Sequence, residues 1–337
     1  MGDALERSEI GDRKPSDVSV VICAYTLHRW SELNAAVASV REQTYPAREI
    51  FVVIDQESEA LLERARREME GIEVVVNKAA RLSGARTSGA ELATAPIVVF
   101  LDDDAIADRN WLAHLVETFQ DPRVLGAGGH IDPLWLRPPP GWFPAEFNWI
   151  VGCTYTGMPV HNGQVRNLLG ANMAVRADVI RRTGGFTAGW GGGSTRLGGP
   201  RGGKAVSEAC DETEFCIRAS RQFPGGIWLY CPQARIQHVV PAQRTTWRYF
   251  VRRCRMEGTA KSVLTGVTGS RDGLGSERRY VLTIAQSFFR YLITGNFGRA
   301  FAIFVGLAVT AIAYGQTRLL QALAKTWSGE RLNCRIR

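Results

Sequence analysis

The sequence predicts an α/β fold, in which a mostly parallel β-sheet is flanked by helices and a helical region follows at the C-terminal end. Three observations support this prediction. In the N-terminal third, short β-branched runs alternate with helical patterns. These runs are almost continuously apolar, which is typical of strands buried on both faces of a parallel sheet. From position 280 onward, apolar residues recur at helical spacing.

The predicted elements alternate in a regular order. Strands are expected at Val18–Ala24, Glu49–Ile54, 72–76 and 97–101, and helices at 30–40, 61–69 and 84–94. In parallel sheets of this kind, ligands bind beyond the carboxyl ends of the strands. The polar residues that follow the strands are therefore the first candidates for a functional site.

The composition is that of a globular protein. The 337 residues are 45% apolar and 22% charged, which allows one elaborated domain with a sizeable core and excludes wholesale disorder. Residues 1–17 are polar and lack an apolar run, so we expect a flexible leader there. The seven cysteines form no CxxC pair, which favours a reducing compartment. The net charge of +8 indicates an anionic partner.

The most specific motif is the run of three aspartates at 102–104, directly after the fourth predicted strand. Adjacent carboxylates repel one another, and a divalent cation such as Mg²⁺ or Mn²⁺ would offset that repulsion. The alternative is a solvated strand end or a helix cap, for which one aspartate would suffice. His238, in the strand-like segment 234–240, is a plausible further metal ligand, and a packed histidine is the alternative.

A second acidic stretch, 211–214, opens a predicted helix. One of the carboxylates in this stretch is a candidate general base that takes a proton from an acceptor hydroxyl. The alternative is that these acids only complement the helix dipole.

Over residues 18–260 the order of these motifs resembles that of family-2 glycosyltransferases of the GT-A fold, which are inverting enzymes that use nucleotide-sugars. The segments that carry the resemblance are 43–46 with 49–55, 81–86, 101–104, 170–176 with 184–186, 211–214 and His238. The resemblance implies a nucleotide-diphosphate sugar donor and an acceptor hydroxyl.

The resemblance also implies roles for individual residues. Donor binding is assigned to Asp55, Arg81, Gly84, Arg86, Asp102 and Asp103. The divalent cation is assigned to Asp102, Asp104 and His238. Glu212 is expected to be the catalytic base, with Asp211 as second choice, and Asn172 is expected on the acceptor side. The glycine-rich segment 189–203 is a candidate lid, in which Trp190 could stack on the acceptor sugar.

We expect the catalytic domain to span 18–262, with a nucleotide-sugar-binding half at 18–131 and an acceptor-binding half at 132–262. The helical C-terminal region would then span 263–337. Within it, residues 300–317 carry no charge, at the lower length limit for a membrane span. A span, a helix lying in the lipid interface and a soluble helical subdomain all remain open here. Either membrane interpretation makes a polyprenyl- or lipid-linked acceptor at the cytoplasmic face of a membrane the expected substrate.

A basic helical face at Arg248, Arg252 and Arg255 would suit a diphosphate, a phosphate-bearing acceptor or lipid headgroups. Nucleic acid is not expected, because no nucleic-acid-binding motif accompanies these residues. Two other functions stay open: a nucleotidyltransferase acting on sugar phosphates, and a non-catalytic module that binds sugar-nucleotides. The absence of a GxGxxG after the first strand argues against a dinucleotide-binding oxidoreductase.

Overall fold

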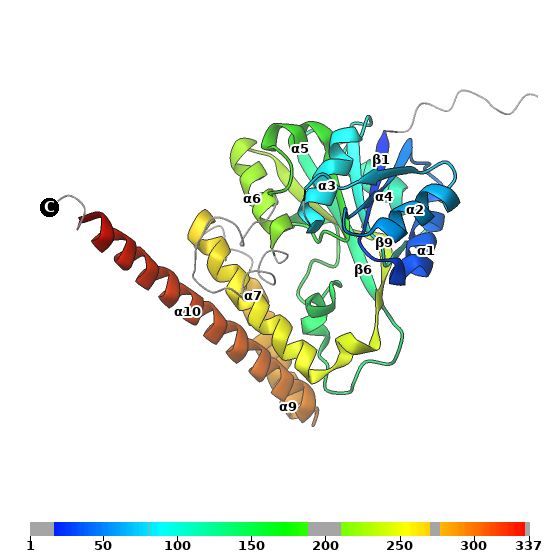
Figure 1. Ribbon diagram of the computed structural model, residues 1–337. Helices are drawn as coiled ribbons and strands as arrows, with labels where there is room; N and C mark the ends of the chain where they lie inside the picture. The colour runs from blue at the N-terminus through cyan, green and yellow to red at the C-terminus, as the bar shows by residue number, and fades with distance from the viewer. Residues whose placement is uncertain (1–16, 80, 188–209, 270–276, 334–337) are drawn as a thin grey trace, which may run out of the picture.

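The computed structural model of the protein describes residues 17–79, 81–187, 210–269 and 277–333. Its centre is a nine-stranded sheet with helices on both faces (Figure 1). The strands are β1 (Val18–Ala24), β2 (Glu49–Ile54), β3 (Glu73–Val76), β4 (Ile97–Asp102), β5 (Ala105–Ala107), β6 (Val124–Trp135), β7 (Gly163–Val165), β8 (Asn172–Arg176) and β9 (Ile227–Val240).

The longer helices are α1 (Trp30–Arg41), α2 (Glu59–Glu68), α3 (Arg81–Leu92), α4 (Trp111–Thr118), α5 (Ala177–Thr183), α6 (Asp211–Gln222), α7 (Trp247–Thr268), α9 (Glu277–Ile293) and α10 (Phe297–Asn333). Three short 3₁₀ helices connect other elements: η1 (Leu27–Arg29), η2 (Ala145–Val151) and η3 (Ala242–Thr245). The predicted α/β fold is confirmed.

The sheet has the order β3-β2-β1-β4-β8-β6-β9-β5, with β7 beside β9. The strands β3, β2, β1 and β4 are parallel, as the sequence predicts. Beyond β4 the sheet becomes mixed, because β8 runs antiparallel to both β4 and β6, and β5 and β7 run antiparallel to β9. The parallel half places the carboxyl ends of β1, β2 and β4 along one edge.

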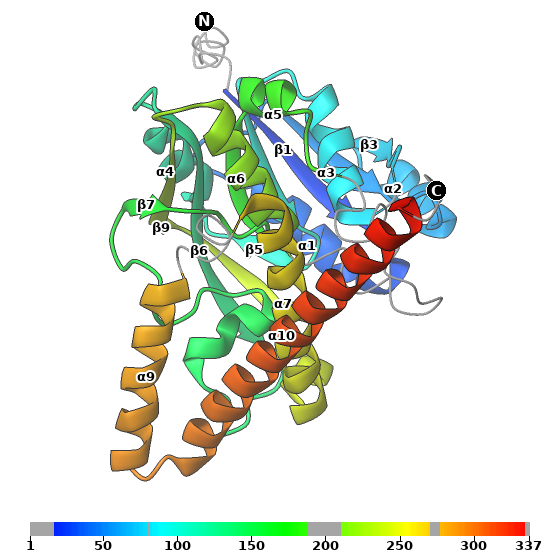
Figure 2. The same ribbon diagram turned by 90° about the vertical axis from the view of Figure 1, so that its left-hand side faces the viewer.

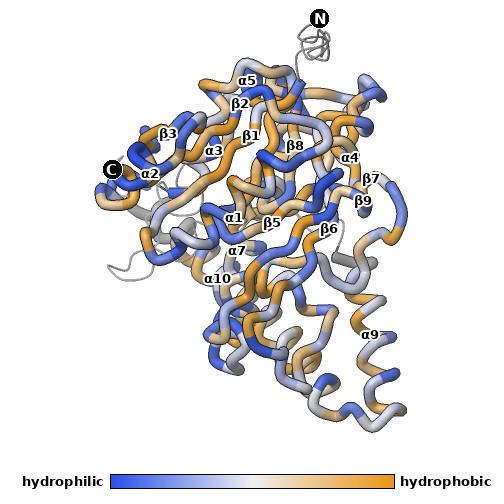
Figure 3. The backbone as a smooth tube through the Cα atoms, turned by 90° about the vertical axis from the view of Figure 1, so that its right-hand side faces the viewer, coloured by the Kyte–Doolittle hydropathy of each residue, from blue (hydrophilic) through white to orange (hydrophobic). Residues whose placement is uncertain are grey.

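Two apolar cores lie on the two faces of this sheet. Along β1, Val20 and Ile22 point into the core that α1, α2 and α4 cover. Val21 points into the opposite core, which α3, α5 and α6 cover. Every residue of β1 is buried, and β1 and β2 are mostly hydrophobic (Figure 3). Burial on both faces explains why these strands read as continuous apolar runs.

The C-terminal helices pack on the rest of the chain. Helix α10 lies along α7 (Figures 1 and 2), and a side chain at Gly258 would have its Cβ 2.2 Å from the Thr310 carbonyl oxygen. Ile284, Tyr291 and Ile303 belong to the core that also contains β1 and α1. The extension therefore shares the main hydrophobic core.

One helix of the described chain is long and apolar enough to cross a membrane. It is the part of α10 from Phe297 to Leu323, and 28% of its apolar window is buried against the protein. The segment 300–317 falls inside it.

Candidate active site

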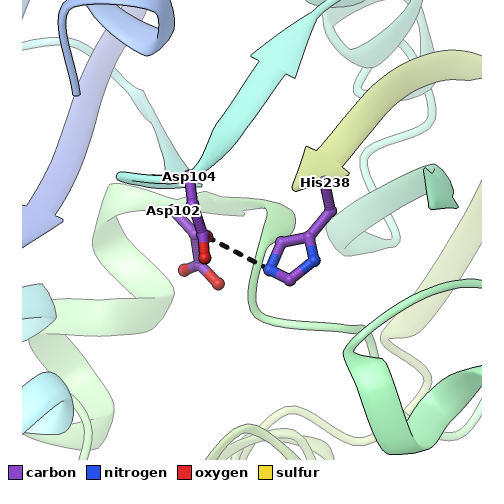
Figure 4. A group of neighbouring side chains, drawn as sticks. All are labelled: Asp102, Asp104 and His238. Atoms are coloured by element: carbon purple, nitrogen blue, oxygen red, sulfur yellow. Dashed lines mark ion pairs between the residues drawn. The ribbon is translucent and has the colours of Figure 1, made fainter. Parts of the chain in front are cut away.

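Three side chains that could hold a metal ion meet at the carboxyl edge of the sheet. Asp102 ends β4, Asp104 lies in the turn before β5, and His238 lies on β9. Antiparallel pairing of β5 with β9 puts Ala105 opposite His238, which brings the imidazole beside the aspartates. His238 Nε2 lies 3.1 Å from Asp104 Oδ1, and one ligand atom from each residue lies within 4.8 Å of the others (Figure 4).

The donor set of this group fits a divalent cation. Carboxylate oxygens suit Mg²⁺ and Mn²⁺, and an imidazole nitrogen is compatible with Mn²⁺. The Asp104 and His238 side chains are 5% exposed, whereas the Asp102 side chain is 27% exposed. The group is therefore held firmly on one side and accessible on the other, where substrate oxygens could complete the coordination.

Two arginines that sequence reasoning did not identify hold the aspartates in place. Arg29, five residues after β1, has its Nη1 2.8 Å from Asp103 Oδ1 and 3.0 Å from Asp104 Oδ2. Arg244 in η3 has its Nη2 3.8 Å from Asp104 Oδ2. Burial raises the pKa of Asp104, but the His238 hydrogen bond and the nearby cations outweigh burial and lower that pKa to about 2.

Asp103, which the resemblance assigns to donor binding, points inward. It is 3% exposed, and its carboxylate is held by Arg29. Burial raises the pKa of Asp103 to about 7. Asp104 shares the Arg29 contact, but its other carboxylate oxygen faces His238 of the metal group. This geometry assigns Asp103 to anchoring the turn.

Arg86 connects the metal group to the acidic start of α6. Its side chain is 2% exposed, and its Nη1 lies 2.8 Å from Glu212 Oε1 and 3.4 Å from Asp211 Oδ2. Its Nη2 lies 3.7 Å from Asp102 Oδ1. The expected donor-binding arginine thus faces three carboxylates of its own chain.

The two carboxylates of α6 have different environments. Asp211 is 2% exposed and accepts a hydrogen bond of 2.8 Å from Ser83 Oγ, whereas the Glu212 side chain is 20% exposed. Burial and the charge of Glu212 raise the pKa of Asp211 well above its usual range. Burial also acts on Glu212, but Arg86 outweighs it and lowers the pKa of Glu212. The negative charge of the pair therefore resides on Glu212, the more accessible of the two.

Gly170, in the expected acceptor-side segment, makes room for this arrangement. A Cβ at Gly170 would lie 2.0 Å from Glu212 Oε1 and 2.3 Å from Arg86 Nη2. No side chain fits there unless the ion pair moves.

The remaining expected donor residues lie near the same edge of the sheet. Asp55 directly follows β2, and its N–H donates to the Ala24 carbonyl at the end of β1. Arg81 begins α3 with φ at 74°, a left-handed conformation that is uncommon outside glycine. A Cβ at Gly84 would lie 2.4 Å from the Ala79 carbonyl oxygen, so glycine permits the close approach of α3 to the loop after β3.

Asn172, expected on the acceptor side, lies inside the sheet. It is fully buried, its amide donates to the carbonyls of His130 and Ala234, and its oxygen accepts from Trp111 Nε1. Both amide N–H groups are used within the protein, which assigns Asn172 to joining β8 to its neighbours. The candidate lid 189–203, with Trp190, lies outside the described residues.

Comparisons with known proteins identify the class of enzyme as glycosyltransferase. Residues 19–184 match the family described as Glycosyl transferase family 2. The chain is 34% identical over 252 residues to a glucosyl-dolichyl phosphate glucuronosyltransferase of Haloferax volcanii. The aligned region covers 73% of this chain and 77% of the relative. The chain belongs to glycosyl transferase family 2.

Two further relatives are more distant. An uncharacterized glycosyltransferase of a Nostoc species is 29% identical over 119 residues, covering 34% of this chain and 36% of the relative. A crystal structure of GalNAc-T7 with UDP, GalNAc and Mn²⁺ is 20% identical with a TM-score of 0.47. It covers 66% of this chain and 43% of the solved chain.

Proposed function

We propose that the protein is an inverting, metal-dependent glycosyltransferase that moves a sugar from a nucleotide-diphosphate donor to a hydroxyl of a lipid-linked acceptor. The observation that carries this proposal is the partly exposed Glu212 carboxylate, which Arg86 joins to Asp102 of the metal group. The name of the relative from Haloferax volcanii, a glucosyl-dolichyl phosphate glucuronosyltransferase, supports a lipid-linked acceptor. We place the reaction at the cytoplasmic face of a membrane.

The chemistry follows from the positions of the carboxylates. Glu212 accepts the proton of the acceptor hydroxyl while that oxygen attacks the anomeric carbon and the bond to the donor diphosphate breaks. One attack from the face opposite the leaving group inverts the anomeric centre. A divalent cation bound by Asp102, Asp104 and His238 would neutralise the charge on the departing nucleoside diphosphate.

The other residues position these groups. Arg86 keeps Glu212 ionised and fixes its carboxylate. Arg29 holds Asp103 and Asp104, and thereby the turn that carries the metal ligands. Asp55 and Arg81 lie at the edge where a parallel sheet binds ligands, and we assign them to the nucleotide.

The test begins with the donor. Nucleotide-sugars are screened by thermal shift with Mn²⁺, since a ligand that binds only the folded state raises the melting temperature. The donor that is found is then assayed with acceptors, and release of a nucleoside diphosphate is expected. Release of pyrophosphate would instead identify a nucleotidyltransferase.

Glu212→Gln tests the base. The variant should keep its donor affinity and lose about 10²–10⁴-fold in kcat, the usual contribution of a general base. Glu117→Gln, the same substitution at an exposed position of α4, is the control and should turn over normally. If Asp211→Asn is slow and Glu212→Gln is not, the two roles are exchanged. If both variants turn over at the unmodified rate, the proposed mechanism is wrong.

A further inference from the structure

The outer faces of α9 and α10 carry most of the exposed apolar surface. Of the 19 large hydrophobic side chains that are exposed among the described residues, 5 lie on α9 and 7 on α10. All four exposed phenylalanines of that part of the chain are among them: Phe289, Phe297, Phe301 and Phe304. Apolar exposure on this scale marks an interaction surface.

On each helix most of the exposed apolar residues form one stripe, while Leu320 on α10 and Val281 and Leu292 on α9 lie to the side of it. On α10 the stripe runs through Phe297, Phe301, Phe304, Ile312, Leu319 and Leu323. This spacing follows the turn of an α-helix. On α9, Leu282, Phe289 and Ile293 repeat the pattern.

The two helices form a V on one side of the molecule (Figure 2), and in Figure 1 α9 is partly hidden behind α7 and the lower part of α10. Both helices therefore lie at this side of the molecule. The outer stripes of α9 and α10 can meet a flat partner together.

The inner face of α10 is committed to the protein. Ala300, Ala302 and Ile303 are buried, and Thr310 Oγ1 donates to the Cys254 carbonyl of α7 at 3.2 Å. A spanning helix would have to leave α7 or draw α7 into the lipid with it. The uncharged stretch 300–317 is also only about 27 Å long at 1.5 Å per residue, short of a hydrocarbon core of roughly 30 Å.

Three segments that meet at this side of the molecule carry no Asp or Glu: 133–145, 241–256 and 278–329. They do carry exposed arginines. Arg318 lies off the apolar stripe of α10 by helical spacing, and Arg248 starts the exposed face of α7. Arg290, in contrast, is paired with the buried Glu146 at 3.4 Å. An apolar face with cationic edges and no carboxylate complements an anionic lipid surface.

The surface continues to the active site. The Trp247 ring stacks on Phe301 with centroids 5.8 Å apart, and the Trp142 ring lies 4.8 Å from Trp247. Tryptophans at such a boundary are typical of residues at the membrane–water interface. Arg244, which contacts Asp104, lies only three residues before Trp247.

We propose that the protein docks on an anionic membrane through the outer faces of α9 and α10, with α10 lying in the plane of the membrane and not spanning it. The proposal deepens the function proposed above and rests on it for the identity of the acceptor, since this orientation brings the metal group close to lipid-linked substrates. The docking itself requires neither donor nor acceptor, so it can fail or succeed separately from catalysis.

The experiment measures binding of the full chain to vesicles without substrates. Vesicles of phosphatidylcholine with phosphatidylglycerol should bind it, and vesicles of phosphatidylcholine alone should bind it much more weakly. Phe297→Ser with Phe304→Ser should lower the partition coefficient by roughly tenfold for each phenylalanine. Arg248→Gln and Arg318→Gln should lower it by about fivefold each on the anionic vesicles.

Matched controls alter the same residue types elsewhere. Leu92→Ser removes an exposed apolar side chain from the end of α3, and Arg66→Gln with Arg67→Gln removes two charges from α2. Both controls should bind anionic vesicles as the unmodified chain does. Equal losses in the controls and the test variants would overturn the assignment of this surface, as would failure of the unmodified chain to bind.

Orientation is tested with an environment-sensitive label placed at Phe304→Cys or at Ile312→Cys, in a chain whose own reactive cysteines are replaced by serine. A helix in the plane predicts the same shallow depth at both positions, about 5–10 Å below the surface. A label at position 312 near the bilayer centre would show a span. If light scattering finds a dimer in solution and both labels are already shielded from water without vesicles, the occupant of this surface is a second copy of the chain. Either result overturns the proposal.

Discussion

The Arg86 guanidinium lies 2.8 Å from the Glu212 carboxylate, and the same guanidinium reaches Asp102 at 3.7 Å. One buried cation thus contacts both the proposed base and a proposed metal ligand. The Arg86 side chain is only 2% exposed, so its charge needs these carboxylates as partners. The proposed base and the proposed metal ligand are coupled through this residue.

Replacing Arg86 should move the pH dependence of catalysis. The lowered pKa of Glu212 keeps the base ionised to a pH below the usual range of glutamate, so the acid limb of kcat/KM should lie there. In Arg86→Met, the largest influence that opposes burial is lost, so the pKa of Glu212 should rise and the limb should move to higher pH. Arg86→Lys keeps the charge and should move it less.

Arg86→Met should also lower the free energy of unfolding by about 3–5 kcal/mol, since it leaves buried carboxylates without their cation. Arg176→Met is the control. Arg176 donates to the Val124 and Phe119 carbonyls away from the site, so its loss should reduce stability without moving the pH profile. An acid limb that stays in place in Arg86→Met would show that Arg86 does not set the ionisation of the base.

Gly170→Ala should slow catalysis by displacing the ion pair. The added methyl would lie 2.0 Å from Glu212 Oε1, and a misplacement of about 1 Å can cost on the order of 10²-fold in rate. Mn²⁺ affinity, measured by calorimetry, should stay near that of the unmodified protein. Gly141→Ala is the matched control, because nothing lies within 4 Å of its Cβ position. Equal rates for the two variants would show that the close approach of Glu212 to Gly170 does not matter for catalysis.

Removal of a metal ligand should abolish metal-dependent turnover. Asp104→Asn or His238→Ala should lower Mn²⁺ affinity and reduce kcat by about 10²-fold or more, since a metal ion supplies several kcal/mol of charge stabilisation. Asp121→Asn, at a partly exposed carboxylate paired with Arg123, should change neither quantity. Full activity of the unmodified enzyme in EDTA would rule out the metal-dependent mechanism.

Asn172→Ala distinguishes a structural role from a role in acceptor binding. Loss of the amide leaves the His130 and Ala234 carbonyls and Trp111 Nε1 without their partner, at about 1–3 kcal/mol for each buried group. Urea unfolding should therefore show a large loss of stability for Asn172→Ala. Asn34→Ala, at an exposed position of α1, should show little loss. A stable Asn172→Ala protein with weakened acceptor binding would restore the role implied by the family resemblance.

The parallel half of the fold could be predicted from the sequence to within three residues, the largest difference being at the start of α3. β1 and β2 begin and end where their apolar runs do. β6 could not be predicted, because Gly126, Gly128 and Gly129 interrupt its pattern. The structure explains these glycines: a Cβ at Gly129 would lie 1.7 Å from the Ala234 carbonyl oxygen. The glycines that let β6 approach β9 closely have a low strand propensity, so the sequence does not indicate a strand there.

The site shows a similar division. The metal group could be predicted, because three aspartates at a strand end are unusual by themselves. The pairing of Arg86 with Glu212 could not be predicted, because 126 positions separate the two residues and the contact depends on how α3 and α6 pack. The roles of Arg29 and Gly170 likewise depend on partners that only the folded chain brings near.

The seam between α7 and α10 limits how this enzyme can be produced or remodelled. From the sequence, a chain ending near Ser276 is expected to be soluble, as though the extension were a detachable anchor. The structure places Ile284, Tyr291 and Ile303 in the central core, and Gly306 leaves room for the Phe147 ring. Shortening the chain would uncover that core and invite aggregation. A soluble form is better sought by polar substitutions on the outer stripe, and a chimera with a related enzyme should exchange α7, α9 and α10 as one unit.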